Sequence, residues 1–138
     1  MLRRDNKADL FAKVPLFAAC SRKDLHKIAA IADELDIREG KVLTWQGGPG
    51  REFFVLLDGS VDVVRDDTRI NTLAAGDFFG EMALISQKPR SATITTTSPV
   101  RVLVVTETNF RRLLRENPSI SMKVLETVAE RTPPGDSD

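Results

Sequence analysis

Two charged residues near the middle of the chain have the types and neighbours needed to recognise a phosphorylated sugar. Arg90 offers a planar, permanently charged fork for phosphate oxygens. Glu81 offers a carboxylate that can accept hydrogen bonds from sugar hydroxyls. Gly80 permits a close approach of the backbone, and a helical turn after it would present unpaired N–H groups to an anion. Together these residues predict a nucleotide site.

Small residues follow the arginine, and an apolar segment precedes it. Ser91 adds a hydroxyl group and Ala92 keeps the wall of the site small. About 17 residues separate the predicted strands that end at Leu73 and begin at Ser91, with Arg90 at the start of the second. Their centre, Phe78–Ile85, is apolar, and we expect a buried turn of helix in which Met82 and Leu84 pack. Long ordered insertions between strands are common places for binding sites.

The spacing of these residues resembles a known motif. The pattern is Phe79-Gly80-Glu81-Met82-Ala83-Leu84-Ile85, three residues, then Pro89-Arg90-Ser91-Ala92. It resembles the phosphate-binding cassette of cyclic-nucleotide-binding domains, which regulate cyclic-AMP-dependent kinases, cyclic-nucleotide-gated channels and catabolite-activator-type transcription factors. The resemblance extends over about Val14 to Val128 and includes Pro15-Leu16-Phe17, Arg38-Glu39-Gly40, Gln46-Gly47, Phe53-Phe54-Val55-Leu56, Gly59 and Val61-Asp62-Val63.

The resemblance implies a role for each residue of the motif. Glu81 would bind the ribose 2′-hydroxyl and Arg90 the cyclic phosphate. Backbone groups of Gly80, Met82 and Ala83, together with Ser91 and Ala92, would complete the cradle. The implied ligand is a cyclic nucleotide. In cGMP-selective relatives a hydroxyl residue directly after the arginine contacts guanine, as Ser91 could, but serine also occurs in cAMP binders, so both nucleotides stay open and cAMP is favoured over cGMP.

Two features of the chain depart from the family pattern. Many members carry an acidic residue after a glycine of an early turn, where it orients the phosphate arginine; Arg51 stands there in this chain, with Glu52 beside it. An inward-pointing Arg51 would repel Arg90, which carries the same charge, whereas Glu52 could take the place of the missing acidic residue. The final helix, Ile120–Arg131, also has no aromatic residue that could cover the ligand.

The elements around the motif predict a mainly β fold with flanking helices. Short runs rich in β-branched or aromatic residues alternate with turn signals, which favours an antiparallel β jelly roll. The strands are expected at 35–38, 42–45, 53–57, 60–65, 69–73, 91–97 and 100–105. We expect a single domain, 1–138: a helical lead-in over 1–34, the jelly roll over 35–105, C-terminal helices over 106–131 and a disordered tail over 132–138.

Helix signals flank the strands. Ser21 and Asp24 have the spacing of a capping box. Leu25, Ile28, Ala29, Ala32 and Leu35 follow at helical spacing. Near the C-terminus, Pro118 suits the first position of the last helix.

Composition narrows the functions that remain. The 20 basic and 20 acidic residues balance, which argues against a nucleic-acid binder. No metal-ligand spacing, catalytic triad pattern or triphosphate loop is present, so we expect no catalytic residue, no metal and no cofactor. No apolar run approaches the roughly 20 residues of a membrane span, and Cys20 is the only cysteine, so we expect a reducing, cytoplasmic location.

Partners follow from the same features. The expected partners are a small-molecule cyclic nucleotide and an effector domain or partner protein, with a homodimer formed through the C-terminal helix as an option. A protein-interaction module that uses the same fold without nucleotide stays open as the alternative.

Overall fold

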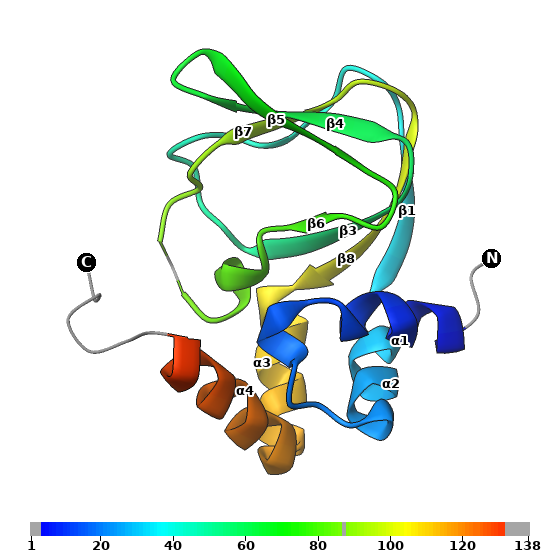
Figure 1. Ribbon diagram of the computed structural model, residues 1–138, viewed down its shortest axis with the longest axis vertical. Helices are drawn as coiled ribbons and strands as arrows, with labels where there is room; N and C mark the ends of the chain where they lie inside the picture. Colours follow the sequence, from blue (N-terminus) through cyan, green and yellow to red (C-terminus); the bar gives the residue numbers. More distant parts are fainter. Residues whose placement is uncertain (1–3, 87, 132–138) are drawn as a thin grey trace. The chain divides into compact units, whose positions relative to one another are not determined.

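The computed structural model describes residues 4–86 and 88–131, and its contacts divide the chain into two compact units (Figure 1). One unit, residues 32–108, holds the β-sheets. The other unit holds the helices and consists of the described residues before 32 and after 108. The tail predicted to be disordered, 132–138, lies outside the described residues.

The β unit contains two antiparallel sheets of four strands each. One has the order β1 (Asp33–Ile37), β8 (Val100–Thr106), β3 (Glu52–Asp58), β6 (Phe78–Phe79). The other has the order β2 (Val42–Thr44), β7 (Thr93–Thr96), β4 (Ser60–Arg65), β5 (Thr68–Ala74). Figure 1 shows the two sheets facing each other. The predicted mainly β, jelly-roll architecture is therefore confirmed.

Apolar side chains from both sheets fill the space between them. The buried members of this core are Phe54, Leu56, Val61, Phe79, Ile94, Val100, Val102 and Val104. The rings of Phe54 and Phe79 stack with centroids 4.8 Å apart, which ties β6 to β3 beyond the short hydrogen-bonded pairing. Alternate burial is clearest along β7, where Ile94 and Thr96 are buried and the residues between and before them are less so.

The helical unit is built from α1 (Arg4–Ala12), the 3-10 helix η1 (Pro15–Phe17), α2 (Arg22–Ala30), most of α3 (Glu107–Glu116) and α4 (Pro118–Arg131). Phe17 packs against Phe11 and Phe110, with ring centroids 6.2 and 5.8 Å apart. Pro118 begins α4, as predicted. Within the described part of the chain, every helix is too short or too polar to cross a bilayer.

The predicted capping box at the start of α2 is confirmed. The amide of Asp24 donates to Ser21 Oγ at 3.1 Å, and the amide of Ser21 donates to Asp24 Oδ2 at 2.9 Å. The same carboxylate accepts a hydrogen bond from Lys123 Nζ at 2.6 Å. Burial alone would raise the pKa of Asp24, but the bonds from Lys123 and Ser21 outweigh it and hold that pKa below its ordinary value.

The predicted helical stripe extends too far. Helix α2 ends at Ala30, and β1 begins at Asp33, two residues before the expected start of the strands. Leu35 pairs with Val102 in the sheet and is 47% exposed. Its helical spacing from Leu25 and Ile28 is therefore coincidental, because pairing with β8 sets the conformation of this segment.

Candidate functional site

The segment between β6 and β7 starts with a sharp change of direction at Gly80. Phe79 pairs with Phe54 in β3, Gly80 adopts a left-handed conformation with φ of 83°, and the 3-10 helix η2 covers Glu81–Leu84. The prediction of a helical turn from Phe78 onward is therefore wrong for its first two residues, because strand pairing keeps them extended.

The side chains of η2 do not all pack inward. Leu84 is fully buried, as expected. Met82 is 48% exposed, so the prediction that it packs in the core is wrong. In a 3-10 helix residues two apart lie on different faces, which separates these two side chains. Met82 instead lines a cavity beside Arg90.

Arg90 lies before the strand instead of at its start. Strand β7 begins at Thr93, so Arg90, Ser91 and Ala92 precede it. The backbone of Arg90 is held by a glycine-rich loop: its amide donates to the carbonyl oxygen of Gly48 at 2.9 Å, and its carbonyl oxygen accepts from the amide of Gly47 at 2.8 Å. The loop, and not the sheet, fixes this residue.

The guanidinium group of Arg90 is packed among backbone atoms. Its Nη2 donates to the carbonyl oxygen of Glu52 at 2.5 Å. A Cβ atom at Gly50 would lie 3.3 Å from both Cδ and Nε of Arg90, and one at Gly80 would overlap Nη1. These glycines leave the space in which the guanidinium lies.

One nitrogen of this guanidinium lacks an acceptor. Arg90 Nε is buried and has no hydrogen-bond partner among residues 4–86 and 88–131. Burial lowers the pKa of Arg90 and the charge of Glu52 acts in the opposite direction, but an arginine stays protonated at neutral pH. A buried cationic donor without an acceptor is costly, which suits a site that receives an anion.

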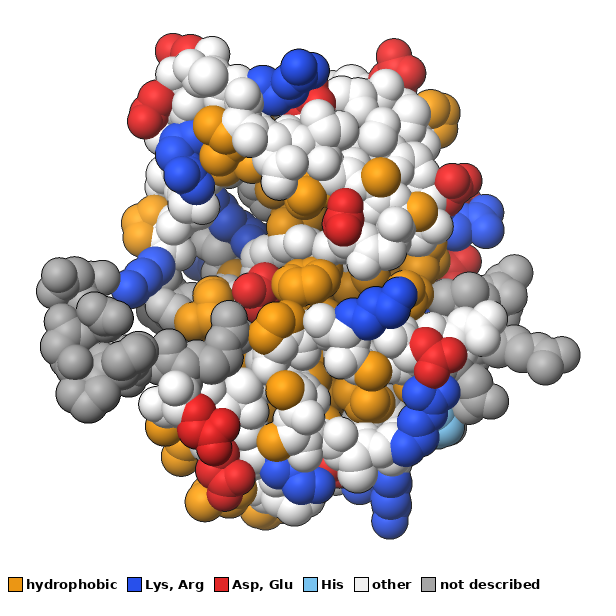
Figure 2. Space-filling model, viewed as in Figure 1, with side chains coloured by type: hydrophobic (Ala, Val, Ile, Leu, Met, Phe, Trp, Pro, Cys, Tyr) orange, Lys and Arg blue, Asp and Glu red, His pale blue; other side chains and the backbone are white. Residues whose placement is uncertain are grey.

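Two cavities meet at Arg90. One, of about 310 Å³, is lined by Gly50, Gly80, Met82, Ala83, Arg90 and Ser91 together with the segment Lys88–Pro89 and Ser86. The other, of about 260 Å³, reaches between the sheets and shares Gly80, Arg90 and Ser91 with the first. Figure 2 shows Lys and Arg side chains at the rim of a hollow in the β unit and inside it.

Most of the predicted site residues come together in these cavities. Gly80, Met82, Ala83, Arg90, Ser91 and Ala92 each line at least one of them. Glu81 lines neither and is half-buried at the first position of η2. The amide of Ala83 already donates to the carbonyl oxygen of Gly80 at 3.0 Å, so it is not offered to a ligand in this conformation.

The side chain of Arg51 is exposed. It lines a separate cavity of about 520 Å³ with Glu52 and Thr106, which is larger but does not include Arg90. The contact that orients Arg90 comes from the main-chain carbonyl of Glu52, and its carboxylate contributes a favourable charge. Glu52 therefore supplies part of the orienting role that the usual acidic neighbour would have.

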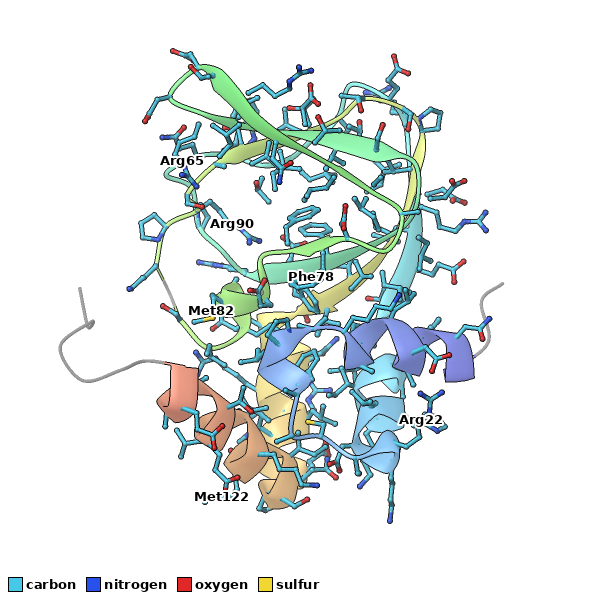
Figure 3. All side chains as sticks on the ribbon, in the orientation of Figure 1. Arg22, Arg65, Phe78, Met82, Arg90 and Met122 are labelled. Atoms are coloured by element: carbon cyan, nitrogen blue, oxygen red, sulfur yellow. The ribbon has the colours of Figure 1, made fainter. Side chains whose placement is uncertain are left out.

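The sequence-based prediction missed two groups of residues. Gly47, Gly48 and Gly50 were not selected as site residues, although three glycines in four residues indicate close backbone approach. Arg65 was placed in a strand without a role, but its Nε donates to the carbonyl oxygen of Ser91 at 3.0 Å. Figure 3 shows Arg65 and Arg90 at the same end of the barrel.

The described residues contain no group of three or more His, Cys, Asp or Glu side chains that could hold a metal ion.

A family model and several curated proteins match this chain. The family model described as "Cyclic nucleotide-binding domain" matches residues 34–117. A cyclic nucleotide-gated potassium channel of Rhizobium etli is 35% identical over 122 residues, which cover 88% of this chain and 34% of the channel. The chain spans between 24% and 34% of the length of the curated relatives it matches.

Solved structures match over most of the chain. The N-terminal domain of a transcriptional regulator from Streptomyces coelicolor A3(2) superposes with a TM-score of 0.81 at 27% identity, covering 94% of this chain and 99% of that one. The cAMP-bound PfPKA-R superposes with a TM-score of 0.67 at 27% identity, covering 92% of this chain and 46% of that one.

Proposed function

The chain belongs to the cyclic nucleotide-binding domain family, and from this premise we propose that it binds a cyclic nucleotide, cAMP in preference to cGMP, at Arg90. The buried Nε of Arg90, which has no acceptor in the described part of the chain, is the observation that supports this most directly. A cyclic phosphate placed there would supply the missing acceptor and neutralise the charge.

The neighbouring residues support the same placement. The cavity of about 310 Å³ at Met82 and Ala83 and the cavity of about 260 Å³ between the sheets lie on two sides of Arg90. A ligand with its phosphate at Arg90 could therefore place its ribose and base in these spaces. Glu81 would have to turn toward the first cavity to bind the ribose 2′-hydroxyl.

The preference for cAMP rests on a structural neighbour. PfPKA-R, which matches 92% of this chain, is a cAMP-bound structure.

The ligand would act by shifting an equilibrium between two states of the protein, and it can do so only by its difference in affinity for the two states. The output would pass to an effector domain or partner protein, in the cytoplasm.

Calorimetric titration with cAMP and cGMP tests the proposal. Arg90→Gln removes the charge-assisted contact and should weaken binding about ten- to 150-fold. The matched control is Arg69→Gln: Arg69 lies on β5, is exposed and lines neither cavity. Full-strength binding by Arg90→Gln would show that the ligand lies elsewhere, and no heat from the folded wild-type chain would refute nucleotide binding.

Turnover of the bound nucleotide is not part of the proposed function. Hydrolysis of a cyclic phosphate would normally need a metal cluster or a general base beside it. Long incubation of cAMP with the protein should therefore yield no linear monophosphate by chromatography. Its appearance at a rate proportional to protein concentration would overturn this.

A second candidate function rests on the surface of α4. Met122 and Leu125, three residues apart, are 55% and 61% exposed and lie on one side of the helix. Such an apolar pair suits a protein partner or a second copy of this chain. Sedimentation velocity of the wild-type chain and of Leu125→Glu tests dimerisation; one concentration-independent monomer for both would exclude it.

A further inference from the structure

Two rows of inward-facing residues run toward Arg90 from neighbouring strands. On β4 the row is Val61, Val63, Arg65; along β7 and the residues before it, the row is Ile94, Ala92, Arg90. Val63 is the partner of Ile94 in the sheet, so the rows lie side by side. Each row is apolar in the core and ends in an arginine at the mouth of the cavity between the sheets.

An arginine in an inward-facing row of a barrel needs a reason. The Nε of Arg65 donates to the carbonyl oxygen of Ser91, which anchors the guanidinium beside Arg90. No described residue accepts a hydrogen bond from its two terminal nitrogens. These nitrogens therefore remain available to a ligand in the cavity of about 260 Å³ that Arg65 lines.

The neighbouring strand in the same sheet adds a second hydrogen-bond donor. Asn71 on β5 is the partner of Val63 and lines the same cavity. Its side-chain oxygen already accepts the amide of Thr72 at 2.8 Å, which leaves its NH₂ group. Arg65 and Asn71 thus present donors, while Val63, Leu73 and Phe79 supply apolar walls for a flat ring.

Purine bases differ in the edge that would meet such donors. Guanine presents two acceptors, O6 and N7, whereas adenine presents the N7 acceptor beside an N6 amino donor. A guanidinium group can pair with both guanine acceptors at once. Resting on the proposed function, we infer that Arg65 is a specificity-determining residue that binds the O6/N7 edge of guanine, so that the protein accepts cGMP as well as cAMP.

Titration with three ligands separates this role from simple anchoring. The ligands are cAMP, cGMP and cyclic inosine monophosphate, which has the O6/N7 edge of guanine but lacks its 2-amino group. Arg65→Gln should lower affinity for cGMP and for the inosine nucleotide about tenfold more than for cAMP. Loss of the Ser91 contact alone would weaken all three ligands equally.

Two further variants complete the test. Arg69→Gln, on the neighbouring strand and outside the cavity, should leave the affinity ratios of the wild type. Arg65→Lys keeps the charge without the planar fork and should behave like Arg65→Gln. Thermal denaturation checks that each variant is folded, which the exposure of Arg65 leads us to expect.

Three outcomes would overturn the inference. Equal weakening of all three ligands by Arg65→Gln would leave Arg65 only the anchoring of Ser91. A loss for cGMP but not for the inosine nucleotide would mean that the effect of Arg65 depends on the 2-amino group and not on the O6/N7 edge. If the folded wild-type chain bound none of the three, the proposed function would fail, and the role of Arg65 with it.

Discussion

A side chain at Gly80 would occupy the space that the guanidinium group of Arg90 fills. An ideal Cβ at Gly80 would overlap Nη1 of Arg90 and lie 2.9 Å from the carbonyl oxygen of Glu52. The glycine at the turn and the arginine ten residues later therefore depend on each other, because the one leaves the room in which the other is held.

Gly80→Ala should displace Arg90 and weaken cyclic nucleotide binding at least about tenfold, as measured by calorimetry. The substitution also strains the backbone, at roughly 1–2 kcal/mol for a left-handed residue. Gly76→Ala separates the two effects: its φ is also positive, at 93°, but a Cβ there meets nothing within 4 Å. Both variants bear the strain of the left-handed backbone, Gly80→Ala should lose at least as much stability as Gly76→Ala because of the overlap, and only Gly80→Ala should lose binding. Equal affinity of the two variants would show that the overlap is relieved without cost.

Glu81→Ala should weaken binding of cAMP about tenfold or more and leave binding of 2′-deoxy-cAMP unchanged, because only the ribose carries the hydroxyl that the carboxylate would accept. Competition of both nucleotides against a fluorescent analogue measures the ratio. Because Glu81 lines neither cavity at Arg90, the prediction requires this side chain to move when ligand binds. Equal losses for the two nucleotides would give Glu81 a purely structural role.

Gln46→Ala should loosen the loop that holds Arg90. The side-chain amide of Gln46 makes two hydrogen bonds with Asp66. Its Nε2 donates to Asp66 Oδ1 at 2.8 Å, and its Oε1 accepts from the backbone amide of Asp66 at 2.9 Å. Since the pair is exposed, its loss should cost at most about 1 kcal/mol of stability. Hydrogen exchange should nevertheless speed up at the amides of Gly47 and Arg90. The amide of Leu56, bonded to Asp77 in the same unit, serves as the reference and should not change.

Acid should destabilise the helical unit through Asp24. The pKa of this carboxyl is lower in the folded protein than its ordinary value of 3.8, so its stabilising effect is complete above that value and is lost as pH falls through the lower, folded-state pKa. The melting temperature of the wild type should therefore fall more steeply below about pH 4 than that of Asp24→Asn. Asp9→Asn, which removes an exposed pair with Arg22, should follow the wild type. Parallel curves for wild type and Asp24→Asn would contradict the assignment.

Features that depend on local sequence could be predicted, and features that depend on tertiary pairing could not. The Ser21–Asp24 capping box and the start of α4 at Pro118 follow from the residues beside them. The conformation of Phe78 and Phe79 does not, because it is set by pairing with β3. Leu35 fits both the helical stripe and the predicted strand 35–38, and only its pairing with Val102 decides that it lies in a strand.

The candidate site divides in the same way. Gly80 and Arg90 could be selected because each has a residue type that suits its chemistry. Arg65 could not be selected, because its relation to Ser91 depends on the register between β4 and β7. The loop of Gly47 and Gly48 contributes backbone atoms, whose hydrogen bonds to Arg90 leave no trace in side-chain type.

The two inward rows that end in Arg65 and Arg90 also bear on how the selectivity of such a barrel can evolve. Val61 and Ile94 lie deep in the rows and are constrained by close packing, so substitutions there endanger folding. Arg65 is exposed at the end of its row, so a substitution there leaves the packing of the core intact. A single codon change at the last inward position of a strand can therefore alter which base is accepted while the scaffold persists, which makes this position a natural starting point for engineering biosensors with new ligands.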